Sequence, residues 1–371
     1  MGEKSRLRYS ARPKICCLPG LPMLMGLLAL LVLLNLTGKS QIFDQTETIR
    51  VDTDLVTINV VVSERSGEPG VERLRAEDFN VIEDGVRQKI ASFSTAGVPF
   101  SLVLLIDTSG STREDVALIR QAARRFLDAL RPADRLAIVQ FNREVELVRN
   151  LTDDRERLEK GLNQLQPGSG TSFYDALQLT IDDVLGKIAG RKVVIALTDG
   201  VDSFGHLTYD QITPAVEQAG ATIYFLQLDT EAFTGDGLQR GCHLPGHFEF
   251  SAKQLRKYRR EYTEKGGPFN ESHCELSQIE RLQINRRLYE SARRELRTIA
   301  TQTGGQVFPV TRISQLDEAY SRIAAELRSV YSIAYYPTRE KHDGRWRRLQ
   351  VEVRRPGLVA RTRTGYRAAS N

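Results

Sequence analysis

The middle of this chain, residues 98–330, alternates continuous apolar segments with segments of helical periodicity. The segments "SLVLLID", "RLAIVQF", "RKVVIALTD" and "ATIYFLQL" are apolar along most of their length, as strands buried on both faces are. Stretches such as "DVALIRQAARRFLDAL" and "ISQLDEAYSRIAAELRSV" repeat apolar residues at helical spacing. This alternation predicts an α/β fold with a doubly wound, mostly parallel sheet that helices cover on both faces.

The flanking segments contain short strands that no helix interrupts. Residues 41–97 include "LVTINVVVS" and "FNVIEDGVRQKIASFS", which the pattern predicts to be two strands joined at Asp84-Gly85. Residues 331–371 include "YSIAYYPT", "RRLQVEVRR" and "LVARTRTGY". Each segment offers about three strands, too few for a stable β domain of its own. We therefore expect the two segments to pair in one small, discontinuous antiparallel β domain.

Residues 1–40 have the pattern of a secretory signal. Basic residues precede an apolar run from Leu21 to Leu36, and the small residues Gly38 and Ser40 follow it. The run is short for a transmembrane helix, which needs about 20 residues. Cleavage after Ser40 is therefore the first interpretation, and an uncleaved signal anchor is the second. In both cases we expect an extracytoplasmic protein, secreted or held at the membrane by this segment alone.

The charge of the chain does not indicate a nucleic-acid partner. The net charge is +5 over 371 residues, and the 52 Lys and Arg are spread among 47 Asp and Glu. No basic run is interleaved with aromatic residues, as it is in many nucleic-acid-binding proteins. We expect no nucleic acid to bind.

Small oxygen-bearing residues occur in three loops at the carboxyl edge of the predicted sheet. Asp107, Ser109 and Ser111 follow one strand, Thr171 follows the Gly-rich "PGSG", and Asp199 ends a later strand. Each residue alone is typical of a helix cap or a turn. Ligands of such sheets lie outside the carboxyl ends of the strands. Two carboxylates and three hydroxyls there indicate a site for a hard cation, and the lack of nearby His or Cys argues against zinc.

These five residues, in this order and on these elements, resemble the metal-ion-dependent adhesion site (MIDAS) of the von Willebrand factor A domain. The flanking segments further resemble the bacterial VWFA-related domain family of secreted proteins. The resemblance implies a Rossmann-like sheet, a bound Mg²⁺ (or Mn²⁺ or Ca²⁺), and binding rather than catalysis. Ser109 and Ser111 would then ligate the ion directly, Thr171 directly or through water, and Asp107 and Asp199 largely through water.

An ion held mainly by neutral hydroxyls keeps much of its positive charge. The expected partner is therefore a protein that offers an Asp or Glu carboxylate, in adhesion or assembly. The alternative is a Mg²⁺-dependent, phosphatase-like enzyme with Asp107 as nucleophile, because "LLIDTSGST" resembles a strand-end D-x-D-G-T motif. Ser109 stands where such an enzyme has its general acid, and it cannot transfer the proton at neutral pH. The sequence also lacks the G-x-S-x-G motif of many serine hydrolases, so a non-enzyme is favoured.

An insertion of about residues 231–285 precedes the next predicted helix, "RRELRTIATQTGG". It includes the basic helical segment "AKQLRKYRREYTEK" and the only cysteines that remain after signal removal, Cys242 and Cys274. A disulfide between them is expected in an oxidising compartment, and a zinc site with nearby histidines is the alternative. An apolar stripe at helical spacing is expected to pack in the core. Its residues are Leu276, Ile279, Leu282, Tyr289 and Leu296.

Overall fold

The computed structural model describes residues 55–66, 73–95, 98–240, 247–263, 272–338 and 343–368. All of them belong to one structural unit, Asp52–Asn371. The predicted signal segment, residues 1–40, lies outside the described residues and stays a prediction. None of the helices in the described part of the chain has the length and apolar character to span a membrane.

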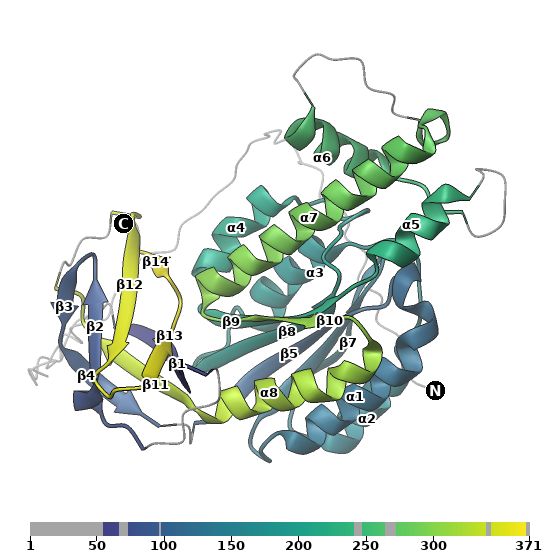
Figure 1. Ribbon diagram of the computed structural model, residues 1–371. Coiled ribbons are helices and arrows are strands. Elements are labelled where there is room, and N and C mark those ends of the chain that lie inside the picture. Colours follow the sequence, from purple (N-terminus) through teal and green to yellow (C-terminus); the bar gives the residue numbers. More distant parts are fainter. Residues whose placement is uncertain are drawn as a thin grey trace, which may run out of the picture. The chain divides into compact units, whose positions relative to one another are not determined.

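A six-stranded sheet forms the centre of the α/β region (Figure 1). Its strand order is β10-β9-β8-β5-β6-β7, and every neighbouring pair is parallel except β6 and β7. That antiparallel pair was not predicted, and it follows from the short connection between the two strands, since parallel strands need a long crossover. The strands are β5 (Phe100–Asp107), β6 (Arg135–Phe141), β7 (Val145–Thr152), β8 (Arg191–Thr198), β9 (Ala221–Leu228) and β10 (Val307–Val310).

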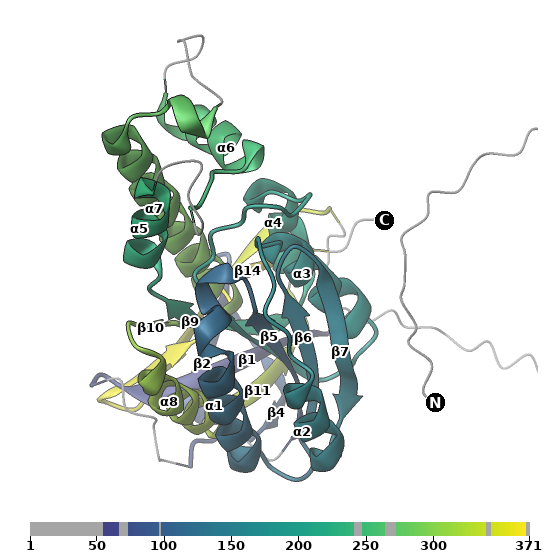
Figure 2. The same cartoon turned by 90° about the vertical axis from the view of Figure 1, so that its right-hand side faces the viewer.

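Helices cover both faces of this sheet (Figures 1 and 2). Helices α1, α2 and α8 bury their apolar faces in one core layer, and α3, α4 and α7 bury theirs in the other. The predicted α/β fold is therefore confirmed. The helices are α1 (Val116–Ala129), α2 (Arg155–Asn163), α3 (Phe173–Leu179), α4 (Tyr209–Gln218), α5 (Glu231–Gln239), α6 (Ala252–Tyr262), α7 (Gln278–Thr303) and α8 (Leu316–Arg328).

Two four-stranded antiparallel sheets combine the two ends of the described chain. Their orders are β13-β1-β11-β4 and β14-β12-β2-β3. In the first sheet, strands from before and after the α/β region alternate, and in the second, two strands from after it pair beside two from before it. This confirms the small antiparallel β domain built from both ends, whereas the predicted domain limits stay predictions. The strands are β1 (Val56–Glu64), β2 (Phe79–Glu83), β3 (Val86–Gln88), β4 (Ile90–Ser94), β11 (Val330–Tyr335), β12 (Trp346–Val353), β13 (Leu358–Arg361) and β14 (Gly365–Arg367).

The segment predicted as two strands around Asp84-Gly85 forms three. Asp84 and Gly85 both have positive φ, 47° and 81°, as in the tight hairpin turn that the sequence predicts. The chain then changes sheets at Lys89, because β3 pairs with β2 and β4 pairs with β11. A change of pairing partner at a single residue leaves no break in the sequence pattern.

The described residues of the insertion are mainly helical, and α7 begins earlier than predicted. The Ser277 hydroxyl accepts a hydrogen bond from the Glu280 amide (3.2 Å), and the Glu280 carboxylate accepts one from the Ser277 amide (2.8 Å). This reciprocal cap starts the helix at Gln278. Ile279 is 70% exposed and Leu282 is 39% exposed, so the prediction that both pack in the core is wrong. The first turns of α7 pack against other residues of the insertion instead of the sheet. Only one side of the helix is covered in these turns, so side chains on the other side stay exposed.

Cys274 is disulfide-bonded, so its sulfur is not available to bind zinc. Cys242 lies outside the described residues. The predicted pairing of Cys242 with Cys274 therefore stays a prediction.

Glu83 connects the two sheets of the β domain. Its carboxylate is buried and accepts hydrogen bonds from the hydroxyls of Tyr335 (2.6 Å) and Tyr366 (3.0 Å). We predict that Glu83→Ala lowers the free energy of unfolding by about 2–4 kcal/mol, because two hydroxyls lose their acceptor and a void forms. Chemical denaturation measures this change. The control, Glu159→Ala on the exposed side of α2, should change it by less than about 0.5 kcal/mol, and an equal effect would contradict the prediction.

Candidate metal site

Strand β5 carries Asp107 to the carboxyl edge of the sheet, where the chain turns sharply. The Asp107 side chain is buried, and its Oδ1 accepts a hydrogen bond from the Ser109 amide (2.9 Å). The Thr112 hydroxyl lies 3.1 Å from the carbonyl oxygens of Asp107 and Ser109 and donates to them, which closes the turn. The hydroxyl oxygens of Ser109 and Ser111 are consequently 3.3 Å apart. Two neutral hydroxyl oxygens are thus side by side next to a carboxylate.

The loop before α3 places Thr171 against the two neighbouring loops. The Gly168 amide donates to the carbonyl of Thr108 (2.7 Å), which joins this loop to the one after β5. The Thr171 amide donates to the Ser203 hydroxyl (2.9 Å), and the Thr171 carbonyl accepts from the amides of Ser203 and Phe204 (both 2.9 Å). No described residue forms a hydrogen bond with the Thr171 hydroxyl. Its oxygen therefore remains available as an ion ligand.

Asp199 follows β8, and groups from three elements fix its buried carboxylate. Its Oδ1 accepts a hydrogen bond from the Val201 amide (2.9 Å). Its Oδ2 accepts from the hydroxyls of Thr230 (2.6 Å) and Tyr289 (3.3 Å). Thr230 lies between β9 and α5, and Tyr289 lies in α7. No pattern in the sequence indicates Thr230 as a partner of Asp199. Tyr289 was expected in the apolar core, because its ring suits a core position and a position beside Asp199 equally well.

Thr198 links the two acidic loops. Its hydroxyl donates to Asp107 Oδ2 (2.8 Å) and accepts from the Gly200 amide (3.0 Å). Thr198 was not among the predicted site residues. Its position could have indicated it, because Thr198 ends a buried strand directly before Asp199. A hydroxyl at such a position needs a polar partner, and the neighbouring acids can supply one.

Asp107 and Asp199 are two buried carboxylates that influence each other. Burial, and then the charge of Asp199, raises the pKa of Asp107 to about 7, and burial raises the pKa of Asp199. Across the described ranges, no Lys or Arg forms an ion pair with either carboxylate, and no group of three or more His, Cys, Asp or Glu could hold a metal. A divalent cation bound among these oxygens would offset the unfavourable burial of both acids.

The structure brings the loops of all five predicted ligands together at one edge of the sheet. Thr198 bonds to Asp107 and directly precedes Asp199, while Thr171 is tied to Ser203 in the loop after β8. The arrangement is compatible with the predicted ligand set. That these residues bind an ion stays a prediction.

Comparison with known proteins identifies the α/β region. Residues 102–201 match the family model of the von Willebrand factor type A domain. The α/β region of the chain therefore contains a von Willebrand factor type A domain. All five predicted ligands lie within the matched part of this A domain.

Three solved structures are similar to this chain. The vWF domain of the type V pili tip protein Mfa5 from Porphyromonas gingivalis is 25% identical over 28% of this chain and 39% of its own, with a TM-score of 0.26. BatB from Bacteroides thetaiotaomicron is 14% identical over 62% of this chain and 100% of its own, with a TM-score of 0.40. Proximal thread matrix protein 1 from the mussel byssus, solved with a zinc-occupied MIDAS motif, is 14% identical over 64% of this chain and 49% of its own, with a TM-score of 0.38. The matches span less than half of the Mfa5 and mussel chains.

The raised pKa of Asp107 makes the metal-free fold sensitive to pH. Because this pKa is higher in the folded chain than in the unfolded one, the contribution of Asp107 to stability is present at low pH and is lost as the pH rises through about 7. We predict that Asp107→Asn stabilises the chelator-treated protein, by about 2–3 kcal/mol more at about pH 8 than at about pH 5. Denaturation at both pH values measures the difference. Exposed Asp183→Asn is the control, and an equal gain at both pH values would contradict the prediction.

Proposed function

We propose that the A domain binds a divalent cation, Mg²⁺ in the first place. Ser109, Ser111 and Thr171 would supply hydroxyl ligands, and Asp107 and Asp199 would act largely through water. The observation that carries this proposal is the pair of buried carboxylates that have no cationic partner among the described residues. Hydroxyl, carboxylate and water oxygens suit Mg²⁺, and Mn²⁺ and Ca²⁺ accept the same donors.

The bound ion would then accept a carboxylate from a protein partner. Only two acidic residues surround the proposed ion, so neutral hydroxyls leave part of its charge unbalanced. There is also room beside the site, because Ser111 borders a cavity of about 420 Å³ at the same edge of the sheet. Arg312 lines that cavity together with the acids Asp115 and Asp229, so the cavity offers space for a partner side chain but no surplus of positive charge of its own. These features support a metal-dependent protein-binding module in adhesion or assembly.

The site is less suited to the phosphatase-like alternative. A nucleophilic Asp107 must reach a phosphate, but its side chain is only 1% exposed and both of its oxygens accept hydrogen bonds. The contacts of His206 do not favour a serine hydrolase either. Asp175 accepts hydrogen bonds from the His206 ring and from the backbone amides of His206 and Leu207, so it holds the surface loop in place. The His206 side chain is 95% exposed, as expected for a residue of such a loop. A generic phosphomonoester assay provides the direct test.

We infer an extracytoplasmic location, with the protein secreted or held at the membrane by its N-terminal segment. The signal-like pattern of residues 1–40 supports this location. The disulfide at Cys274 supports it as well, because disulfides persist mainly in oxidising compartments.

Calorimetry with Mg²⁺ and with Mn²⁺ tests the metal site. We predict that the wild-type protein binds the ion and that Asp107→Ala or Asp199→Ala removes binding while the far-UV circular dichroism is unchanged. The control is Asp183→Ala, an exposed acid in the segment after α3. Wild-type affinity in both site variants would reject the ligand assignment.

The open position on the ion is tested with acetate as the simplest carboxylate. In the Mn²⁺-loaded protein, the carboxyl carbon of labelled acetate should relax faster when it exchanges onto the paramagnetic ion. Excess Mg²⁺ or a chelator should abolish this enhancement. An ion that binds tightly but leaves acetate relaxation unchanged would reject the proposed carboxylate acceptor.

Tyr289 should position Asp199 for the ion. Its hydroxyl lies 3.3 Å from Asp199 Oδ2, 2.9 Å from the Thr230 hydroxyl and 2.8 Å from the Thr234 hydroxyl. We predict that Tyr289→Phe weakens Mg²⁺ affinity by roughly tenfold, as loss of an outer hydrogen bond does at other metal sites. The control is Tyr320→Phe, because Tyr320 is equally buried and its hydroxyl has no hydrogen-bond partner among the described residues. Equal affinity in the two variants would show that Tyr289 only packs.

A further inference from the structure

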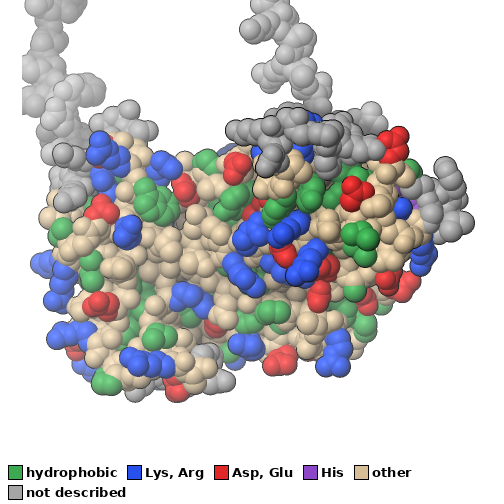
Figure 3. Space-filling model, turned by 45° about the horizontal axis from the view of Figure 1, so that its top comes forward, with side chains coloured by type: hydrophobic (Ala, Val, Ile, Leu, Met, Phe, Trp, Pro, Cys, Tyr) green, Lys and Arg blue, Asp and Glu red, His purple; other side chains and the backbone are tan. Residues whose placement is uncertain are grey.

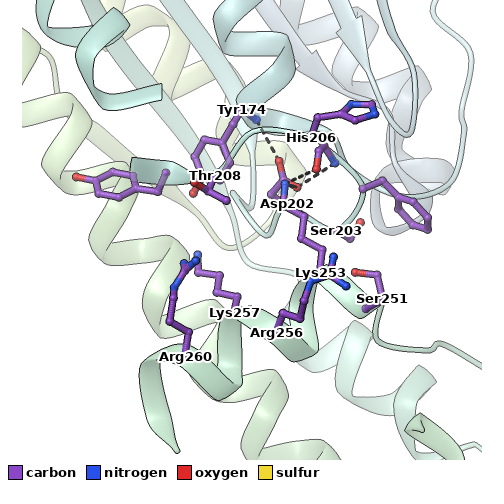
Figure 4. Close-up of a pocket in the computed structure, with 14 residues that line it drawn as sticks. Tyr174, Asp202, Ser203, His206, Thr208, Ser251, Lys253, Arg256, Lys257 and Arg260 are labelled. Atoms are coloured by element: carbon purple, nitrogen blue, oxygen red, sulfur yellow. Dashed lines mark hydrogen bonds and ion pairs between the residues drawn. The ribbon is translucent and has the colours of Figure 1, made fainter. Parts of the chain in front are cut away.

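A second cavity lies next to the loop that carries Asp199. It has a volume of about 530 Å³ and is bordered by that loop on one side and by α6 of the insertion on the other (Figure 4). Tyr174 and Tyr209 contribute aromatic surface to its walls, and Phe204 adds a third ring. The cavity is therefore large enough for side chains of another protein and offers apolar walls to them.

This cavity and the candidate metal site share a wall. Ser203 and Phe204 line the cavity, and both donate backbone hydrogen bonds to the Thr171 carbonyl. The Phe204 ring also packs against Gly170, where a Cβ atom would approach it to 2.2 Å. A ligand in the cavity would thus contact the same loop that holds Thr171 in place.

Helix α6 presents four basic residues to the cavity, namely Lys253, Arg256, Lys257 and Arg260. Their spacing of three or four residues places them on one face of the helix. Figure 4 shows Arg256, Lys257 and Arg260 on the side of the cavity opposite Thr208, while the Lys253 side chain extends to Asp202. Figure 3 shows Lys and Arg side chains gathered on the side of α6 and α7. The rim of the cavity is therefore strongly basic.

Two of these cations already have buried acidic partners. Lys253 Nζ lies 2.6 Å from Asp202 Oδ1 and also donates to two backbone carbonyls. Lys257 Nζ lies 2.7 and 2.8 Å from the carboxylate oxygens of Glu295. These two ion pairs fix α6 to the domain and leave no surplus charge.

The positive charges of Arg256 and Arg260 are not balanced by buried acids in this way. Arg256 is exposed and forms no ion pair or hydrogen bond with any described residue. Arg260 has only a long contact with Glu261, 3.7 Å, on an exposed surface. Guanidinium groups bind carboxylates through paired hydrogen bonds, so the rim has capacity for an anion.

We propose that this cavity is a second contact site for an acidic protein segment, whose carboxylate binds Arg256 and Arg260 while a neighbouring apolar side chain enters between the aromatic walls. The inference rests on the proposed function in one respect: the same partner would place another carboxylate on the bound ion. The charge of the rim selects acidic segments, and the shared wall brings the two contacts onto one face of the A domain.

Fluorescence anisotropy with a labelled oligoglutamate peptide that carries one phenylalanine tests the cavity. The full chain with Mg²⁺ should bind this probe, and Arg256→Glu/Arg260→Glu should weaken binding by at least about tenfold. The matched control is Arg87→Glu/Arg297→Glu, two exposed arginines whose side chains form no hydrogen bond or ion pair with described residues and which give the same change in net charge. Equal binding by both double variants, or no binding by the wild-type chain, would overturn the proposal.

Two further arms separate this inference from the proposed function. If chelation leaves the probe bound and only the Arg256/Arg260 variant loses it, the cavity stands and the metal contact fails. If Asp107→Ala and chelation abolish binding but the Arg256/Arg260 variant does not, the metal contact stands and the cavity fails. Displacement of the probe by inorganic phosphate at lower concentration than by unlabelled oligoglutamate would assign the rim to a free anion and would also overturn the proposal.

Discussion

The burial of Asp107 and Asp199 without a paired cation is the constraint on which this edge of the sheet depends. A carboxylate removed from water is stable only when hydrogen bonds or an opposite charge replace its hydration. Hydroxyls from Thr198, Thr230 and Tyr289 supply part of that replacement. Strand β8, the connection between β9 and α5, and helix α7 must therefore converge at one place. The pKa of Asp107 stays raised despite these hydrogen bonds, so burying its charged form still costs free energy. A bound cation would offset that cost.

The insertion belongs to the framework of this site. Tyr289 of α7 reaches Asp199, and Lys253 of α6 reaches Asp202 three residues further along the same loop. Asp202 is buried, and its partners include the Tyr174 amide (3.1 Å) as well as Lys253. The loop after β8 is thus held by α3, by α6 of the insertion, and by α7, which begins within the insertion and continues beyond it. A movement of α7 would therefore act on Asp199 through a direct hydrogen bond, and a movement of α6 would act on the same loop through Asp202.

The sequence predicts those features that depend on local pattern. Strands β5, β8 and β9 are recognisable because each is apolar along its length, and the candidate ligands because each follows such a strand or a Gly-rich turn. Tyr289 is 90 residues from Asp199, and its ring fits a core stripe equally well until the partner of its hydroxyl is known. Ile279 and Leu282 show the same limit, since helical periodicity defines a face but not what covers it. Lys89, where the chain changes sheets, has no distinguishing signal at all.

The chemistry at this edge selects a partner more sharply than the overall charge does. The net charge of +5 arises from 52 basic and 47 acidic residues and gives no direction to an approaching protein. At physiological ionic strength, exposed charges act over only about 8 Å, so only a local surplus can guide docking. Arg256 and Arg260 provide such a surplus beside the loop after β8, which carries Asp199 and forms hydrogen bonds with Thr171. A divalent ion held by neutral hydroxyls would add a second positive centre nearby. A protein segment with two separated acidic residues could contact both the arginines and the ion, whereas a segment with a single acidic residue could contact only one of them.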